Sequence, residues 1–209
     1  MSHVVLLGDS IFDNAAYVAG GPDVVAQLKG ILPPPWRATL LAVDGAVVAD
    51  VERQLSRIPS DATQLVLSVG GNDSLRHLDI LDRPARSTGE VLDLLAGISS
   101  GFARQYRAML GKVLARGLPT TICTIYEGAL PDPALHRRAG IALHAFNDPI
   151  VRAALESGLS LIDLRLVCSE PGDYANPIEP SVQGGAKIAR AIAAAVGAGE
   201  SGHRSEWFW

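Results

Sequence analysis

Short apolar segments alternate with amphipathic segments along most of the chain. The apolar segments are rich in Val, Leu, Ile and Thr and predict β-strands at residues 4–8, 38–43, 64–69, 120–125 and 159–164. Between them, apolar residues recur with helical spacing and predict helices over most of 22–30, 47–57, 88–116, 134–157 and 181–197. We expect the fourth helix to be interrupted near Asn147-Asp148-Pro149, because proline lacks the N–H that a helix interior needs.

The predicted strands are apolar throughout rather than at every second position. A strand of this kind is buried on both faces, which is typical of a parallel sheet covered by helices on each side. The pattern therefore predicts an α/β protein, a three-layer α/β/α sandwich around a five-stranded parallel sheet. With 209 residues, 48% of them hydrophobic, the chain is expected to form one domain over 1–198, followed by an aromatic tail over 199–209.

Charge and composition narrow the function classes. The formal net charge is −4 and Lys and Arg do not cluster, so neither a nucleic acid nor a membrane surface is an expected partner. The chain opens directly on a predicted strand, and its late apolar segment is interrupted by Arg190, so we expect a cytoplasmic protein. Cys123 and Cys168 lack metal-ligand spacing, and no phosphate-binding motif occurs, so we expect no metal and no cofactor. The expected partner is a small molecule, and a homo-oligomer is compatible with the sequence.

The residues that follow the predicted strands point to acyl transfer. In a parallel sheet the ligand crevice lies beyond the carboxyl ends of the strands. The first three strands are followed by Gly8-Asp9-Ser10, by Asp44-Gly45-Ala46 and by Gly70-Gly71-Asn72-Asp73. A serine hydroxyl can act as a nucleophile, and a backbone N–H together with an asparagine amide can stabilise an oxyanion. Each segment alone also fits a simple turn or a helix cap, so it is the combination that indicates a site.

A glutamate between two prolines lies near the end of the chain. In NPIEPS, residues 176–181, Glu179 stands between Pro177 and Pro180, which stiffen the backbone and keep the residues before them extended. A stiff loop around one carboxylate indicates that this carboxylate is held toward a particular group.

These segments resemble the motifs of the SGNH hydrolases, also called GDSL-type esterases and lipases. The resemblance runs from GDSIFDN at 8–14, through Gly45 and GGND at 70–73, to IEPSVQGGAKIA at 178–189. It implies a flavodoxin-like sandwich and the hydrolysis of esters or thioesters. It also implies that Ser10 is the nucleophile and that the oxyanion hole consists of the Ser10 and Gly45 N–H groups and the Asn72 amide.

The last motif departs from the family pattern. Members normally carry Asp-x-x-His-Pro there, whereas this chain has Asn176 at the aspartate position and Glu179 at the histidine position. We therefore expect Glu179, paired with Asn176, to act as the base or as the electrostatic orienter of Ser10. The unperturbed pKa of glutamate is about 4.3, against about 6.5 for histidine, so the expected rate is modest. Burial would raise the pKa of Glu179 and a donated hydrogen bond would lower it, and both directions stay open.

Three other interpretations of the site also stay open. A histidine from elsewhere can replace the missing one, and an arginine that follows a strand end can contact the serine or the glutamate. Glu179 can also serve only as a cap of the last helix, where the helix dipole favours a negative charge. The candidate residues for the first two interpretations are His77 and His144, and Arg53, Arg76 and Arg165.

Two function classes follow. The first is a serine hydrolase of small carboxylic esters or thioesters that works through an acyl-Ser10 intermediate. The second is a noncatalytic ligand-binding protein on the same fold, in which loss of the Asp and His pair means loss of chemistry. A receiver-like phosphate acceptor at Asp9 fits the fold class but lacks the expected acidic cluster and lysine. Because a binding protein does not need Ser10, Gly45 and Asn72 together, the sequence favours the hydrolase.

Overall fold

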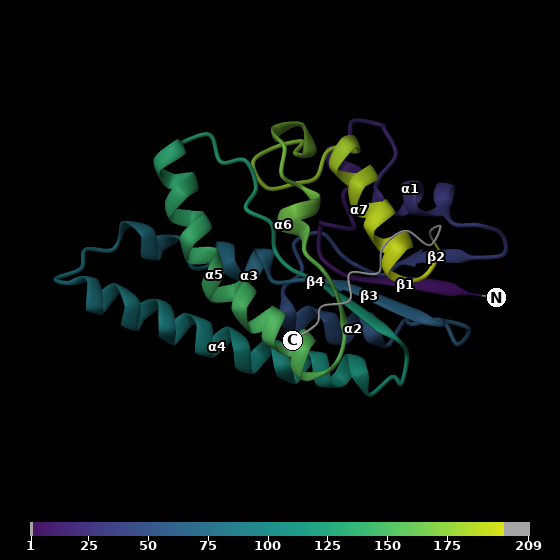
Figure 1. The fold of residues 1–209 in the computed structure, drawn as a ribbon, viewed down its shortest axis with the longest axis horizontal. Coiled ribbons are helices and arrows are strands. Elements are labelled where there is room, and N and C mark those ends of the chain that lie inside the picture. The colour runs from purple at the N-terminus through teal and green to yellow at the C-terminus, as the bar shows by residue number, and fades with distance from the viewer. Residues whose placement is uncertain (1, 199–209) are drawn as a thin grey trace.

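A five-stranded sheet runs through the part of the chain that the computed structural model describes, residues 2–198 (Figure 1). The spatial order of its strands is β2-β1-β3-β4-β5, and every neighbouring pair is parallel. The predicted parallel sheet is therefore confirmed, while the expected aromatic tail at 199–209 lies outside the described residues. The strands are β1 His3–Gly8, β2 Arg37–Leu40, β3 Gln64–Ser68, β4 Thr120–Cys123 and β5 Ser160–Ile162.

Helices connect these strands. The α-helices are α1 Val24–Ile31, α2 Val51–Leu55, α3 Gly71–Leu75, α4 Thr88–Leu114, α5 Pro133–Glu156, α6 Leu164–Val167 and α7 Val182–Ala195. The 3-10 helices are η1 Ala15–Tyr17, η2 Val48–Asp50, η3 Leu78–Asp82 and η4 Pro171–Asp173. The predicted helix at 47–57 is divided into η2 and α2, and α3 and α6 are too short to leave a helical period in the sequence. No helix within residues 2–198 is both long enough and apolar enough to cross a membrane.

Both faces of the sheet are buried, which explains the uninterrupted apolar strands. In β1, Val4 and Leu6 belong to one hydrophobic core and Val5 and Leu7 to the other, and all four are fully buried. Residues of α1 and α7 complete the first core, and residues of α2, α4 and α5 complete the second (Figure 1). Burying each such side chain contributes about 1.5–3 kcal/mol. The three-layer sandwich is thus confirmed.

The predicted interruption of the fourth helix is wrong. α5 continues through Pro149, although a proline in a helix interior costs about 3 kcal/mol. Phe146 and Ile150 are buried in the core beneath the helix, so tertiary packing offsets this cost. Asn147 adds an anchor, because its Oδ1 accepts from the Ile125 N–H and its Nδ2 donates to the Ile125 carbonyl, both at 2.8 Å.

The carboxyl ends of β1 and β3 lie at a topological switch point. From β1 the chain moves to β2 on one side, and β3 pairs with β1 on the other. Ligands of open α/β sheets bind in the crevice at such a point. The loop after β1, which holds Ser10, and the start of α3, which holds Asn72, therefore flank the expected crevice.

Candidate active site

Gly8 is the last residue of β1, and its positive φ turns the backbone out of the strand two residues before Ser10. Its φ is +125°, and a Cβ at this position would lie 1.7 Å from the Ser68 carbonyl oxygen, so only glycine fits. Gln54, from α2, holds both backbone groups of Gly8. Its Oε1 accepts from the Gly8 N–H and its Nε2 donates to the Gly8 carbonyl, each at 2.7 Å. The turn is thus held in place immediately before the serine.

Ser10 and Glu179 meet in the crevice. The Ser10 hydroxyl donates to Glu179 Oε1 at 3.1 Å, and the two residues are only 7% and 5% exposed. The other carboxylate oxygen, Oε2, is buried and has no hydrogen-bond partner within the described part of the chain. The structure therefore brings together the two residues that the sequence pairs from opposite ends of the chain.

Asn176 shapes the loop that carries Glu179. Its Oδ1 accepts from the backbone N–H groups of Ile178 and Glu179, both at 2.9 Å, as an asparagine does in an Asx turn. The Ala175 N–H donates to the Glu179 carbonyl at 2.9 Å and closes the loop. Within residues 2–198 the Asn176 amide makes no hydrogen bond to the Glu179 carboxylate. This differs from the expected pairing: Asn176 contacts the backbone around Glu179 and not its acidic group.

The helix-cap interpretation of Glu179 is wrong. α7 begins at Val182, and the residue that caps it is Ser181, whose Oγ accepts from the Gly184 N–H at 3.2 Å. The carboxylate of Glu179 instead accepts a hydrogen bond from the Ser10 hydroxyl.

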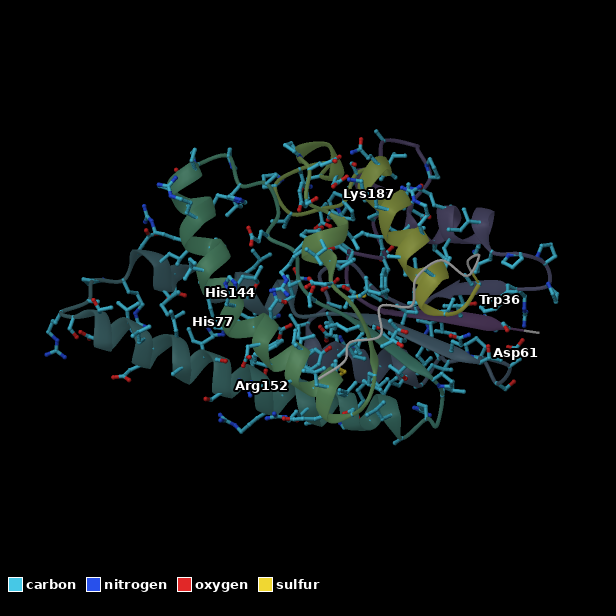
Figure 2. All side chains as sticks on the ribbon, viewed as in Figure 1. Trp36, Asp61, His77, His144, Arg152 and Lys187 are labelled. Carbon is cyan, nitrogen blue, oxygen red and sulfur yellow. The ribbon has the colours of Figure 1, made fainter. Side chains whose placement is uncertain are left out.

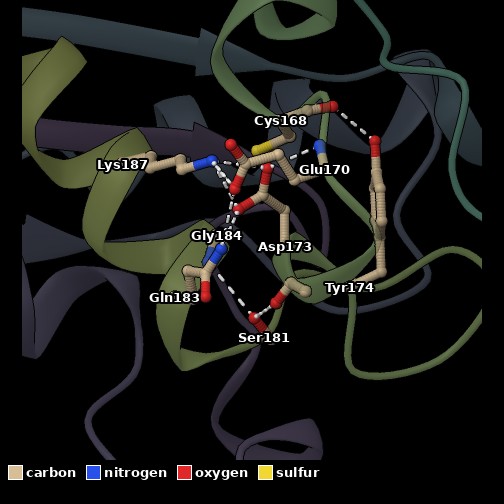
Figure 3. Close-up of polar contacts among 9 residues, drawn as sticks. Cys168, Glu170, Asp173, Tyr174, Ser181, Gln183, Gly184 and Lys187 are labelled. Atoms are coloured by element: carbon tan, nitrogen blue, oxygen red, sulfur yellow. Dashed lines mark hydrogen bonds and ion pairs between the residues drawn. The ribbon is translucent and has the colours of Figure 1, made fainter.

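A polar anchor at the start of α7 holds the base of the Glu179 loop (Figure 3). Asp173 is fully buried, and its carboxylate accepts from Lys187 Nζ at 2.9 Å and from Gln183 Nε2 at 3.1 Å. Its backbone carbonyl accepts from the Ser181 N–H at 2.8 Å. Because Lys187 and Gln183 lie on α7, the segment before the loop and the helix after it form one unit.

Asn14 and Tyr126 tie the site loops together. Asn14 is fully buried; its Nδ2 donates to the Pro180 carbonyl at 3.1 Å and its Oδ1 accepts from the Val24 N–H at 3.0 Å. The Tyr126 hydroxyl, from the loop after β4, donates to the Ile178 carbonyl at 2.7 Å. Asn14 belongs to the GDSIFDN segment, so the motif marked it without revealing its role, whereas only its place after a strand marks Tyr126.

The candidate oxyanion donors lie on the loops after β1 and β2 and in the first turn of α3. Asn72 Nδ2 donates to the Ala46 carbonyl at 3.0 Å, which ties the start of α3 to the loop that holds Gly45. Gly45 has a φ of +76° and is exposed. No hydrogen bond from the Gly45 N–H or the Ser10 N–H is found within residues 2–198, so both groups can donate to an oxyanion.

A largely apolar pocket opens beside Ser10 and Glu179. Both residues line it, together with apolar side chains from α3, η3, α4 and α5, among them Leu75, Leu81, Ile98, Leu143 and Phe146. In the described part of the chain, the acidic and basic side chains that line it are Asp9, His77, Glu127 and Glu179, with no lysine or arginine. Such a lining suits an uncharged group better than an anionic one.

Neither candidate histidine hydrogen-bonds to Ser10 in the described part of the protein, where the Ser10 hydroxyl donates to Glu179. Figure 2 labels both histidines. His144 is exposed on α5, with its Nδ1 2.9 Å from the Gly140 carbonyl oxygen. His77 lines the pocket, and its ring centroid lies 6.0 Å from that of Phe146.

The candidate arginines have other neighbours. Arg53 pairs with Asp50 and Arg165 pairs with Asp163. Arg76 is exposed and its charge acts on Asp73. These positions do not support an arginine partner for Ser10.

Burial disfavours ionisation of the two carboxyl groups beside Ser10. It raises the pKa of Glu179 despite the opposing hydrogen bond from Ser10, and the charge of Asp44 adds to the rise. Burial also raises the pKa of Asp9 to about 8, despite the hydrogen bond from the Ile11 N–H and with a contribution from the charge of Glu179. The sequence left the direction of the Glu179 shift open. The pKa rises toward neutral pH, and a general base works best when its pKa lies near the pH of the reaction.

Replacing Asp9 with asparagine is expected to stabilise the fold at neutral pH. Asp9 is 2% exposed, and burial raises the pKa of its carboxyl group from the ordinary aspartate value of 3.8 to about 8 in the native state. Between pH 3.8 and about pH 8 the native state binds more protons at Asp9 than the unfolded state does. The free energy of unfolding therefore falls as the pH rises, by up to about 1.4 kcal/mol per pH unit. Asparagine keeps the acceptor for the Ile11 N–H, 3.2 Å away, without this cost. Asp9→Asn should gain on the order of 2–4 kcal/mol at pH 7, measured by denaturant unfolding at pH 4, 5.5 and 7.

Asp163→Asn is the matched control with the opposite sign. Despite burial, hydrogen bonds from Arg165 and Thr124 lower the pKa of Asp163. This carboxylate therefore contributes stability above its unfolded pKa that is lost as the pH falls through its native pKa, and asparagine should destabilise the protein at pH 7. Parallel pH dependences of wild type and Asp9→Asn would show that Asp9 is not a buried neutral acid.

The structure is that of an α/β protein whose candidate site lies at the carboxyl edge of the sheet, centred on a serine that is hydrogen-bonded to a carboxylate. The chain belongs to the GDSL-like lipase/acylhydrolase family, which it matches over residues 6–187. No curated protein matches it.

Solved structures of other hydrolases share its fold. The extracellular lipase of Streptomyces rimosus is 16% identical with a TM-score of 0.68, over 93% of this chain and 100% of that chain. A lipase from a goat rumen metagenome is 19% identical with a TM-score of 0.71, over 93% and 97% of the two chains. An acetylxylan esterase from Geobacillus stearothermophilus, in the form of a catalytic mutant, is 18% identical with a TM-score of 0.63, over 94% of each chain. The flavodoxin-like sandwich is thus shared with these proteins.

Proposed function

We propose that this protein is a serine hydrolase of small carboxylic esters or thioesters, acting through an acyl-Ser10 intermediate with Glu179 as the base. The observation that carries the proposal is the 3.1 Å hydrogen bond from the Ser10 hydroxyl to Glu179, beside a largely apolar pocket. Membership of the GDSL-like family supports the reaction class. The similar structures named above include lipases and an acetylxylan esterase, which are ester hydrolases as well.

The proposed reaction has two halves. Glu179 takes the hydroxyl proton of Ser10 while Oγ bonds to the ester carbonyl carbon, and the carbonyl electron pair moves to the oxygen. The Ser10 and Gly45 N–H groups and the Asn72 amide would donate to this oxyanion. As the oxyanion collapses, the bond to the alcohol or thiol breaks, and Glu179 gives that leaving group the proton. Water then attacks the acyl-Ser10 with Glu179 again as base, and the acid and the free serine are released.

Two features support a glutamate in this role. Burial raises the pKa of Glu179, although the Ser10 hydrogen bond opposes this, so the carboxylate is a stronger base than an exposed glutamate. The Asn176 turn and the Tyr126 and Asn14 hydrogen bonds hold its loop against the Ser10 turn. A positioned base is worth about 10²- to 10⁴-fold in rate, and the oxyanion donors contribute independently of it.

The departure from the family histidine favours a second candidate function. A protein with Glu179 in place of that histidine can use the same pocket to bind an uncharged ligand without turning it over. In that case the Ser10 hydroxyl would be a ligand contact and would not become acylated.

Reaction with a fluorophosphonate distinguishes the two functions. In the hydrolase, Ser10 Oγ attacks phosphorus, fluoride leaves, and mass spectrometry is expected to find the phosphonyl group on Ser10. Ser10→Ala should not be labelled. Labelling of Ser56→Ala, a variant of an exposed serine that donates to the Arg53 carbonyl, should match wild type. A protein that neither reacts nor hydrolyses an activated aryl ester would support the binding function, and one that hydrolyses the ester without labelling would exclude Ser10 as nucleophile.

A further inference from the structure

We propose that the apolar pocket beside Ser10 holds the acyl chain of the substrate, and that residues 75–96, which we call the flap, close over this chain. The flap contains η3 and the first part of α4. The preferred substrates are then esters of straight-chain acids of about six carbons. The inference rests on the proposed function and adds to it the acyl group and a conformational change.

The flap lacks the buried residues that fix the rest of α4. From residue 71 to residue 101 no residue is buried, and the buried side chains of α4 begin at Phe102. The first half of α4 extends past the sheet (Figure 1), whereas side chains of the second half belong to one of the two cores. A segment with few buried apolar contacts opens at a low cost in free energy.

Polar contacts do not fix the flap to the rest of the protein either. Its side-chain hydrogen bonds join only its own residues, Arg86 and Ser87 each with Glu90. No flap side chain hydrogen-bonds to or forms an ion pair with any other part of residues 2–198. Asn72 and Asp73, shortly before the flap, are held by hydrogen bonds with the loop after β2 and with η2. The flap can therefore move without displacing the candidate oxyanion donor.

A stretch of glycine and serine joins the flap to the buried part of α4. It consists of Gly97-Ile98-Ser99-Ser100-Gly101 and ends directly before Phe102. A Cβ at Gly97 or Gly101 would have nothing within 4 Å, so close packing does not require glycine there. Glycine in a helix interior is less stable than alanine, and helices kink most readily at Gly and Ser pairs. The stretch therefore provides a hinge at the point where the helix leaves the core.

The flap presents an apolar face to the pocket that Ser10 and Glu179 line. The flap residues in the pocket wall are Leu75, Leu78, Ile80, Leu81 and Leu95, and α5 contributes Leu143 and Phe146 among others. An acyl chain attached to Ser10 can therefore lie between the flap and α5. Because the acyl group stays on Ser10 after the alcohol has left, a wall that closes suits the acyl chain better than the alcohol.

The size of the pocket indicates the length of the chain. Its volume is about 120 Å³. An apolar cavity of about 150 Å³ holds one benzene molecule, so this pocket has room for about five carbons beyond the ester carbonyl. Each methylene that becomes buried contributes up to about 4-fold to kcat/KM. A hexanoyl group would fill the pocket and cover the apolar side chains of the flap.

Two pairs of esters test the place of the acyl chain. Nitrophenyl acetate and nitrophenyl hexanoate share a leaving group, and ethyl hexanoate and hexyl acetate are isomers that exchange the long chain between acid and alcohol. For wild type we expect kcat/KM to be about 10- to 100-fold higher for nitrophenyl hexanoate than for the acetate, and about 5-fold or more higher for ethyl hexanoate than for hexyl acetate. Equal values within either pair would overturn the assignment of the pocket to the acyl chain.

Two leucines of α4 separate the inner face of the flap from its outer face. Leu95 lines the pocket, whereas Leu92 is 60% exposed and does not. Leu95→Ala should lower the ratio of kcat/KM for nitrophenyl hexanoate to that for the acetate by about 3- to 10-fold, because the chain then buries less apolar surface. Leu92→Ala should keep the wild-type ratio. An unchanged ratio in Leu95→Ala would contradict the inference.

Two glycines of the same helix test the hinge. Gly111 lies in the part of α4 that packs on the core, and a Cβ there has open space, as it has at Gly101. Both Gly101→Ala and Gly111→Ala should raise the thermal midpoint by about 1–4 °C. Only Gly101→Ala should lower the hexanoate-to-acetate ratio, by about 3-fold or more, because it stiffens the hinge. Equal ratios in the two variants would exclude a hinge at this stretch.

Hydrogen exchange followed by mass spectrometry tests the flap without turnover. In the free protein, backbone amides of residues 75–96 should exchange faster than those of residues 104–114. Saturating hexanamide, an uncharged and unreactive ligand, should slow exchange in the flap by about 5-fold or more, and acetamide should not.

This measurement distinguishes failure of the inference from failure of the proposed function. If no ester is hydrolysed in a Ser10-dependent manner, slower exchange with hexanamide still supports a pocket that the flap closes. Exchange in the flap that is as slow as in residues 104–114, or that hexanamide leaves unchanged, would overturn the flap even in an active esterase.

Discussion

Ser10→Ala is expected to lower kcat/KM for an activated aryl ester by at least about 10³-fold, which corresponds to about 4 kcal/mol of transition-state stabilisation. The hydroxyl is the one atom that would form the covalent bond, and no other hydroxyl is seen to bond to Glu179 in the described residues. The residual rate would come from the pocket and the oxyanion donors, which the substitution leaves in place. Initial rates of aryl alcohol release, followed by absorbance, measure the effect.

The control for this variant is Ser56→Ala, which removes a hydroxyl from an exposed position on the surface after α2. Its activity should equal that of wild type, and the thermal midpoints of both variants should lie close to that of wild type. A Ser10→Ala protein that is folded and retains most of its activity would refute the acyl-Ser10 mechanism.

Glu179→Gln is expected to lower kcat/KM by about 10²- to 10⁴-fold while leaving the fold intact. Glutamine keeps the shape of the side chain and an acceptor for the Ser10 hydroxyl, but it cannot take the proton. The pH dependence of kcat/KM in wild type should also report the titration of Glu179. A base works when deprotonated, and burial raises the pKa of Glu179 despite the Ser10 hydrogen bond, so activity should fall as the pH drops through this raised value. The Glu179→Gln profile should lack that acidic limb.

Two further variants sharpen the result. Glu52→Gln changes an exposed glutamate that pairs with Lys112 and should leave both rate and pH profile unchanged. Glu179→His introduces the family residue and should move the acidic limb toward the pKa of histidine, about 6.5. A Glu179→Gln protein with the wild-type rate and pH profile would leave Glu179 as a structural partner of Ser10 only.

The regular parts of the fold were predictable because they depend on local pattern. Apolar runs of strand length and segments with helical period identified every strand and the longer helices. The interruption predicted at Pro149 was wrong because the local rule for proline ignores the core that Phe146 and Ile150 join. Short elements such as α3 and α6 were missed because four or five residues do not complete enough turns to show a period.

The residues of the candidate site could be predicted from the sequence, but the hydrogen bonds between them could not. The strand-end positions of Ser10 and Asn72 and the prolines around Glu179 marked them without any coordinates. Asn176 does not make the expected hydrogen bond to the Glu179 carboxylate, because its Oδ1 accepts from two backbone N–H groups of its own turn and this sets the orientation of the whole amide. Several donors lie within reach of any side chain in a tight loop, and the motif does not say which one it takes.

The sequence by itself determined that this chain is a parallel α/β protein with a serine after its first strand and a glutamate where its family carries histidine. Those properties follow from periodicity, proline stereochemistry and motif order, all of which are local. Only the tertiary structure decided that Ser10 and Glu179 are hydrogen-bonded, that burial raises the pKa of Glu179, and that Asp44 lies close enough to act on it. Desolvation and charge proximity depend on which distant segments pack together, and no single segment of the chain contains that information.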